Sequence, residues 1–341
     1  MKTTEPKNSM KSKIRLICAM LGIFVALSTP TSRADTFGSG GNTFTIDFVN
    51  VGNAVNANDV GPNGGPYGGV AYNFRIGTFE VSRDAITKAN ATVALGGGNL
   101  GITLADMTSF GGNGTNRPAT GTSWNEAARL VNWMNTSRGF SAAYKFALQP
   151  GQLGYSANAN IELWVNGDLG YNASNFYRNS NAFYFLPSEN EWYKAAYYSG
   201  SGTTYFDYAL QSNTIPNAVA NGPIGAVYNQ PFSTGPADVA NAGGSSFYGT
   251  RGQNGNVYEW NESAYGAPNN SSSQSRVLRS GDWSANTAEF VLRSSFRGSN
   301  IPSNEYHHGF RVASVPEPST AILILMAGGA CLLRRRPSRS L

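Results

Sequence analysis

Side chains that could support redox chemistry are scarce in this chain of 341 residues. Its two cysteines, Cys18 and Cys331, each lie near an end of the chain. Copper and other soft metal ions favour thiolate ligands, so the long segment between the cysteines offers no site for such an ion. We therefore expect no copper in this segment and no disulfide bond, even though disulfides could form in an exported protein.

The remaining candidates for catalysis are histidines and carboxylates. His307 and His308 are adjacent, and consecutive side chains of a strand point to opposite faces, so one metal ion rarely binds both. Asp282 and Glu289 could meet in a cleft and act together in hydrolysis. The sequence contains no phosphate-binding loop, no Gly-x-Ser-x-Gly nucleophile turn and no HExxH motif.

The net charge of +5 comes from the two ends of the chain. Between residues 35 and 314 lie 15 of the 25 basic residues and 18 of the 20 acidic residues. Because nucleic-acid-binding domains carry a basic surplus, we exclude DNA and RNA as partners of this segment. Its low charge and its many Gly, Asn and Ser residues predict a loop-rich domain.

Residues 1–34 have the pattern of a secretory signal peptide. Basic residues precede an apolar helix predicted from Leu16 to Leu27, and Ser32-Arg33-Ala34 offers a cleavage site before Asp35. We expect a flexible lead-in at residues 35–42. The alternative is a buried helix at the start of a globular domain.

Residues 315–341 form a distinct tail. The motif Pro316-Glu317-Pro318 cannot continue a helix or a strand and marks a hinge. An apolar helix is predicted at 321–333, and the Arg334-Arg335-Arg336 run that follows favours the cytoplasmic face of a membrane. The apolar run is shorter than the roughly 20 residues of a normal spanning helix, which suits a temporary anchor. A permanent single span is the alternative.

The order of these three features resembles the PEP-CTERM sorting signal of Gram-negative bacteria. In that family an exosortase in the inner membrane recognises Pro-Glu-Pro and cuts near it. The resemblance implies export, an inner-membrane intermediate held by the C-terminal helix, and a final place in the cell envelope, on the outer surface or in the extracellular matrix. It implies exosortase as a partner and a matrix polysaccharide as a candidate ligand.

Periodicity between the two ends predicts helices and strands together. Alternation at Phe44, Ile46 and Phe48 predicts a half-buried strand, and similar alternation at 72–76 predicts another. Residues 150–182 and 199–250 predict irregular loops and short strands. Three helices are predicted from serine N-caps, namely Ser82 to about Asn90 and two with capping boxes at Ser123–Glu126 and Ser188–Glu191.

Five segments occur in a characteristic order: GTFEVS at 77–82, TSWNEA at 122–127, FLPSENEW at 185–192, GNVYEW at 255–260, and RVLRSGDW at 276–283 with GFRV at 309–312. Together they resemble the formylglycine-generating, or sulfatase-modifying-factor, family. The resemblance implies a C-type-lectin-like α+β fold over residues 35–314, with few helices, small sheets and many loops. We expect its tryptophans in the core, and we expect Arg279, Arg293, Arg297 and Arg311 to hold loops.

The chemistry of that family is missing from the matching positions. Family enzymes oxidise a substrate cysteine to formylglycine with a copper ion, which two thiolates hold shortly after an R-G-G-S-W phrase. The phrase here is altered at Ser280 and Asp282, and the thiolate positions fall near Ala285 and Phe290. Neither side chain binds copper, so we expect that formylglycine oxidation is lost.

The resemblance also implies a calcium site at residues 255–260. Carried over from the family, Gly255 and Val257 would supply carbonyl oxygens and Glu259 a carboxylate, which are ligands that calcium prefers. A further ligand position falls at Gly252, which has no side chain. Calcium is therefore a candidate cofactor, and the alternative is that Glu259 accepts hydrogen bonds from nearby backbone amides.

These observations predict an exported, exosortase-sorted module that does not generate formylglycine and that binds a glycan or a protein through its loops. One alternative is an enzyme of the same superfamily with cysteine-independent chemistry, such as a hydrolase that uses Asp282 or Glu289. Another is a structural component of the envelope that has no ligand.

Overall fold

The computed structural model describes residues 33–62, 64–92, 97–266, 268–286 and 288–316. The predicted signal helix, the apolar helix at 321–333 and the tail residues after Pro316 lie outside these ranges. No helix within the described ranges is long and apolar enough to cross a membrane.

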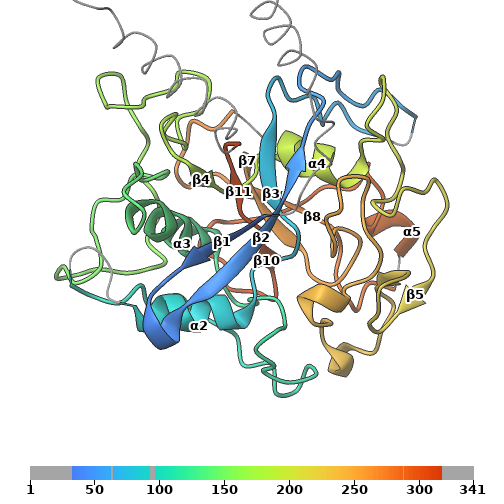
Figure 1. The fold of residues 1–341 in the computed structure, drawn as a ribbon, viewed down its shortest axis with the longest axis horizontal. Helices are drawn as coiled ribbons and strands as arrows, with labels where there is room; N and C mark the ends of the chain where they lie inside the picture. The colour runs from blue at the N-terminus through green and yellow to red at the C-terminus, as the bar shows by residue number, and fades with distance from the viewer. Residues whose placement is uncertain (1–32, 63, 93–96, 267, 287, 317–341) are drawn as a thin grey trace, which may run out of the picture. The chain divides into compact units, whose positions relative to one another are not determined.

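The largest sheet joins the first and last strands of the described chain. Its strands run in the order β1-β2-β3-β11-β4, and every pairing is antiparallel. In Figure 1 the red β11 lies beside β3 and the blue β1–β2 hairpin. The strands are β1 (Arg33–Phe37), β2 (Phe44–Val51), β3 (Phe74–Gly77), β11 (Ala313–Ser314) and β4 (Tyr184–Phe185).

A second sheet aligns strands from two of the five characteristic segments, GNVYEW and RVLRSGDW with GFRV. Its order is β10-β7-β8-β9, with β10 parallel to β7 and the other pairs antiparallel. Glu259 pairs with Gly309 on one side and with Arg279 on the other. The strands are β7 (Glu259–Ala264), β8 (Arg276–Arg279), β9 (Gly298–Asn300) and β10 (Gly309–Phe310), and a separate parallel pair is β5 (Ala218–Val219) with β6 (Ala226–Val227).

The three predicted helices are confirmed, each with its serine cap. The Ser82 hydroxyl accepts from the amide of Ala85, and both capping boxes form completely. Short helical turns occur in the loops. The described helices are α2 (Arg83–Ala91), α3 (Trp124–Thr136), α4 (Glu189–Tyr197) and α5 (Ala288–Val291), with 3-10 turns η1 (Gly40–Asn42), η2 (Phe232–Thr234) and η3 (Val239–Asn241).

The main core lies where β2, α2 and α3 pack together. Phe44, Ile46 and Phe48 of β2 are buried in one cluster with Trp124 and Trp133 of α3. Burying aromatic rings of this size contributes strongly to stability, provided that each indole N–H finds an acceptor. The expectation that the tryptophans of the characteristic segments lie in the core is confirmed, since all of them are buried.

The prediction of a flexible lead-in at residues 35–42 is wrong. Residues 33–37 form β1, which pairs with β2 along its whole length, and η1 follows. Asp35 is buried and accepts from Arg75 Nη2 at 2.6 Å and from the Tyr184 hydroxyl at 2.8 Å. The sequence pattern did not indicate this strand because its polar residue has a distant ion-pair partner.

The second predicted strand also differs from expectation. β3 begins at Phe74, and all four of its residues are buried. Tyr72 lies outside the strand, and its hydroxyl donates to Glu191 at 2.7 Å. Phe74 and Ile76 pack in an apolar cluster, while Arg75 on the opposite face is buried by its bonds to Asp35 and Ser314, so burial does not alternate along β3.

Candidate functional site

The characteristic segments converge on a buried ion pair. Arg311 donates from Nε and Nη2 to the two carboxylate oxygens of Glu259, each at 2.6 Å. The indole N–H of Trp192 also donates to Glu259, at 2.8 Å. Both charged side chains are fully buried, and a two-point contact of this kind is among the strongest polar interactions in proteins. Glu259 thus bonds to a guanidinium and an indole.

The oxygen atoms that this turn could offer as ligands do not fit a calcium ion. Both oxygens of Glu259 are engaged by Arg311, whose positive charge would oppose a second cation. The carbonyl oxygen of Gly255 lies 2.8 Å from the Ser280 hydroxyl, which donates to it. Within the described residues, no group of three or more His, Cys, Asp or Glu side chains could hold a metal ion. We therefore assign no role to calcium here.

Gly252 could not carry the missing ligand in this structure. Its φ of +77° favours glycine, and a Cβ atom there would lie 2.4 Å from the Glu80 carboxylate. Glu80 is buried and accepts from the Asn256 side chain at 2.9 Å, while its other oxygen has no partner among the described residues. Burial, followed by the charge of Glu259, raises the pKa of Glu80 to about 7.

Ser280 replaces a glycine of the family phrase and has an unusual backbone. Its φ is +93°, a region that residues with side chains rarely adopt. Its hydroxyl lies within hydrogen-bonding distance of the carbonyl oxygens of Gly252 (2.9 Å) and Gly255 (2.8 Å). These contacts offset the backbone strain, and they engage the Gly255 carbonyl that the resemblance assigns to calcium.

The two expected thiolate positions lie near the surface. Ala285 is half-buried, and the Phe290 ring is 64% exposed. Neighbouring Asp282 accepts from both the amide and the hydroxyl of Ser284, each at 3.0 Å. Burial raises the pKa of Asp282 above its usual value. The side chain of Glu289 lies outside the described residues, so the suggested Asp282–Glu289 pair stays a prediction.

The two histidines precede β10 and do not lie in a strand, although the prediction had assumed one. His308 is buried, with its ring centre 5.1 Å from that of Trp260. Burial, followed by the charge of His307, lowers the pKa of His308 to about 4, so it is neutral at pH 7. His307 packs among the rings of Phe110, Phe232, Trp283 and Tyr306. Tyr306 also contacts His308, and the expectation that one metal ion does not bind both histidines stays a prediction.

Three of the four singled-out arginines hold loops as expected. Arg279 donates to the carbonyls of Ser294 and Phe296, each at 2.6 Å, and bonds to Glu189. Arg297 and Arg311 likewise combine a carboxylate with backbone carbonyls. Arg293 donates to the Tyr208 hydroxyl at 3.1 Å.

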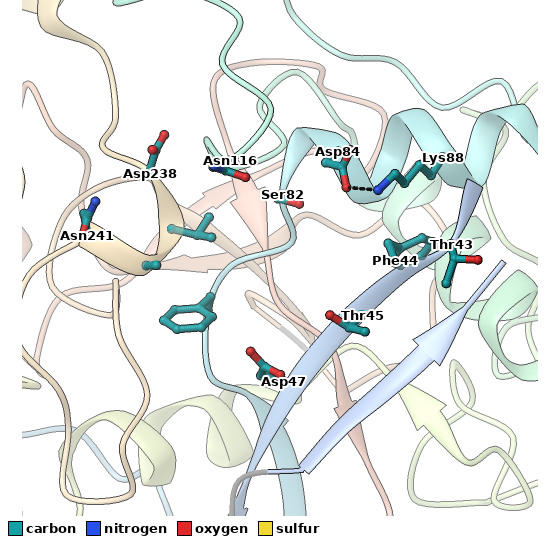
Figure 2. Close-up of a pocket in the computed structure, with 13 residues that line it drawn as sticks. Thr43, Phe44, Thr45, Asp47, Ser82, Asp84, Lys88, Asn116, Asp238 and Asn241 are labelled. Atoms are coloured by element: carbon teal, nitrogen blue, oxygen red, sulfur yellow. Dashed lines mark ion pairs between the residues drawn. The ribbon is translucent and has the colours of Figure 1, made fainter. Parts of the chain in front are cut away.

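A cleft of about 570 Å³ has none of these groups among its lining residues, and the sequence did not predict it (Figure 2). Its walls are β2, the first half of α2, and the η3 turn, with Asn116 between them. These segments are far apart in the sequence and share no motif, so periodicity could not associate them. The lining residues are Thr43, Phe44, Thr45, Asp47, Phe79, Ser82, Asp84, Lys88, Asn116, Asp238, Val239, Ala240 and Asn241.

Comparison with known proteins identifies two parts of the chain. Residues 50–315 match the family model of the sulfatase-modifying factor enzyme 1-like domain, and residues 314–336 match the PEP-CTERM protein-sorting motif. No curated protein matches the sequence. The sorting motif implies processing by exosortase, and therefore export to the cell envelope or the extracellular space.

Two solved structures have a similar fold. Treponema denticola variable protein 1 aligns with a TM-score of 0.55 at 20% identity, over 84% of this chain and 100% of that chain. CarF aligns with a TM-score of 0.55 at 21% identity, over 80% of this chain and 99% of that chain. Such identities support the fold alone, and that fold is the expected loop-rich α+β architecture. With the family match over residues 50–315, the chain belongs to the sulfatase-modifying-factor family.

Proposed function

We propose that this protein is an exported, non-catalytic member of its family that binds a polysaccharide of the cell envelope or extracellular matrix. In this proposal the C-terminal helix anchors the chain in the inner membrane until exosortase cuts at Pro316-Glu317-Pro318. The basic run Arg334-Arg335-Arg336 keeps the end of the tail in the cytoplasm. The folded domain is then free to act outside the inner membrane.

The observation that carries the proposal is the identity of the residues at the two thiolate positions. Ala285 and Phe290 offer no ligand for copper, and Cys18 and Cys331 lie outside the described domain. Copper-dependent oxidation of a peptide cysteine needs such ligands. A large polar cleft supports binding as the alternative use of the fold.

Two assays on the purified protein test the two parts of the proposal. A sulfatase-type peptide that contains the target cysteine is incubated with the protein, copper(I) and oxygen, and we expect no formylglycine by mass spectrometry. Matrix polysaccharide from the host is immobilised, and we expect retention of the folded protein but not of the heat-unfolded control. Formylglycine formation would refute the non-catalytic assignment. Capture of a protein partner, with no retention on polysaccharide, would refute the ligand class.

A hydrolase is the second candidate, and one observation favours it. The raised pKa of Asp282 suits a general acid, because burial keeps more of this carboxyl protonated. The hydrogen bonds from Ser284, however, also fit a purely structural turn. If the variant Asp282→Ala keeps the hydrolytic activity of the wild type, then Asp282 is not the general acid.

A further inference from the structure

We propose that the cleft bounded by β2, α2 and η3 is the polysaccharide site, and that it takes a neutral sugar chain rather than an anionic one. This inference rests on the proposed function and adds a location and a chemical class to it. Figure 2 shows Thr45 and Asp47 on β2, across the cleft from Asp238 and Asn241 at η3.

The first argument is that polar side chains in the cleft are not used by the fold. Asp47, Asn116, Asp238 and Asn241 line the cleft, and their side chains make no hydrogen bond or ion pair within the described residues. Asp238 precedes η3 as its N-cap, yet its side chain makes no capping bond there. Carboxylates and amides that the fold leaves uncommitted remain available to a ligand.

The second argument comes from the shape and the mixed character of the lining. A volume of about 570 Å³ falls within the range of roughly 300–1,000 Å³ that is typical of ligand sites. Half-buried Phe79 and Val239 supply apolar surface, while Thr45 and Ser82 supply hydroxyl groups. A sugar presents both an apolar C–H face and a rim of hydroxyls, so it can use both kinds of surface at once.

The backbone explains why these groups share one wall. Phe44, Ile46 and Phe48 pack in the core, so the alternate residues Thr45 and Asp47 lie on the other face of β2. A smaller cavity of about 70 Å³ shares several lining residues with the cleft and is also lined by Glu80. The shared residues are Thr45, Asp47, Phe79, Ser82 and Val239.

The charge of the lining residues favours a neutral sugar chain over an anionic one. Lys88 is the lining cation, and it is paired with Asp84 at 2.7 Å, as the dashed line in Figure 2 shows. Asp47 and Asp238 have no cationic partner in the part of the chain that the structure describes, so the lining of the cleft carries a net negative charge there. Carboxylates accept hydrogen bonds from sugar hydroxyls, but they repel uronic acids and sulfated sugars.

The test uses isothermal calorimetry with defined probes on the purified protein. The probes are the neutral hexasaccharides of β-1,3-glucan, β-1,4-glucan and β-1,4-mannan, with hexagalacturonate as the anionic probe. We expect binding of at least one neutral probe and at least tenfold weaker binding of hexagalacturonate. The double variant Asp47→Ala/Asp238→Ala should weaken neutral binding at least tenfold, because each carboxylate accepts a charge-assisted hydrogen bond. The control Glu305→Ala removes an exposed carboxylate outside the cleft and should leave binding unchanged.

A charge-only variant separates chemistry from damage to the fold. Asp47→Asn/Asp238→Asn keeps the size of both side chains and removes their charge. It should reduce the difference in affinity between the neutral probes and hexagalacturonate, while the melting temperature stays the same. Neutral binding that is equal in wild type and in the alanine double variant would overturn this inference and leave the proposed function standing. Preferential binding of hexagalacturonate by the wild type would overturn the charge argument. Failure of every probe and of host polysaccharide to bind would overturn both proposals.

Discussion

The buried pair between Asp35 and Arg75 should make β1 essential to the stability of the domain. The Asp35 side chain is 3% exposed, and it accepts from Arg75 Nη2 at 2.6 Å and from the Tyr184 hydroxyl at 2.8 Å. Replacing Asp35 with Ala leaves the buried guanidinium of Arg75 without this carboxylate. Breaking a buried pair in this way typically costs about 3–5 kcal/mol, a large part of the roughly 5–15 kcal/mol that stabilises most proteins.

Urea unfolding followed by circular dichroism measures this loss directly. The control is Asp84→Ala, which removes a half-exposed pair with Lys88 one helical turn away. Such pairs contribute about 0.3–0.5 kcal/mol, so the two variants should differ roughly tenfold in effect. If Asp35→Ala costs no more than the control, then β1 does not stabilise the fold, and the lead-in is flexible after all.

The same pair predicts a direction for the dependence of stability on pH. Burial alone would raise the pKa of Asp35, but hydrogen bonds from Arg75 and Tyr184 outweigh it and hold the pKa below its usual value. A carboxyl whose pKa is depressed in the folded state stabilises that state above its unfolded pKa of about 3.9. Its contribution is lost as the pH falls below that value. Asp35→Asn should therefore unfold with a weaker dependence on pH below about 4.

Four further predictions concern the turn around Gly252. Chelation with EDTA should leave the melting temperature unchanged, and a large drop would show a structural metal. Ser280→Ala should lose about 1–3 kcal/mol, because its hydroxyl is the donor to a buried carbonyl, that of Gly252 or of Gly255. Gly252→Ala should lower the free energy of unfolding by at least about 1–3 kcal/mol through backbone strain, and the clash of the new Cβ with Glu80 adds to this loss. The same urea assay measures it. Unchanged stability would contradict the short distance between residue 252 and the Glu80 carboxylate. Burial raises the pKa of Glu80 to about 7, so the stability of the wild type should fall as the pH rises from about 4.5 through 7. Glu80→Gln should reduce this dependence of stability on pH. An unchanged dependence in the variant would exclude Glu80 as its source.

Local signals predicted α2, α3 and α4 correctly, whereas the short helix α5 was not predicted. Ser123 and Ser188 each begin a helix with a complete capping box, because the serine and the glutamate that form it are only three residues apart. The strand at Phe44–Phe48 was also predicted correctly, because one face of β2 lies in the core and its apolar residues therefore alternate. Predictions succeeded where the partners that determine a structure are near each other in the sequence.

Long-range contacts explain what the sequence did not indicate. The strand β1 depends on Arg75, 40 positions away from Asp35, and Glu259 depends on Arg311, 52 positions away. The resemblance suggested a calcium role for Glu259, but it could not show that a guanidinium occupies both carboxylate oxygens. The cleft was missed for the same reason, because its walls at β2 and η3 have no common pattern in the sequence.

The placement of the family segments explains how the fold can persist without the family's chemistry. Glu191 caps α4 and also receives Arg178, Glu189 receives Arg279 and Arg297, and Glu259 receives Arg311. The pair of Glu189 with Arg279 joins the start of α4 to β8, and none of these contacts involves residues 285 or 290. Because the motif residues hold the scaffold, the loss of two thiolates that we propose would leave all of these contacts in place. The scaffold and the chemistry are therefore separable, which allows a family member to keep the fold and use another surface for binding.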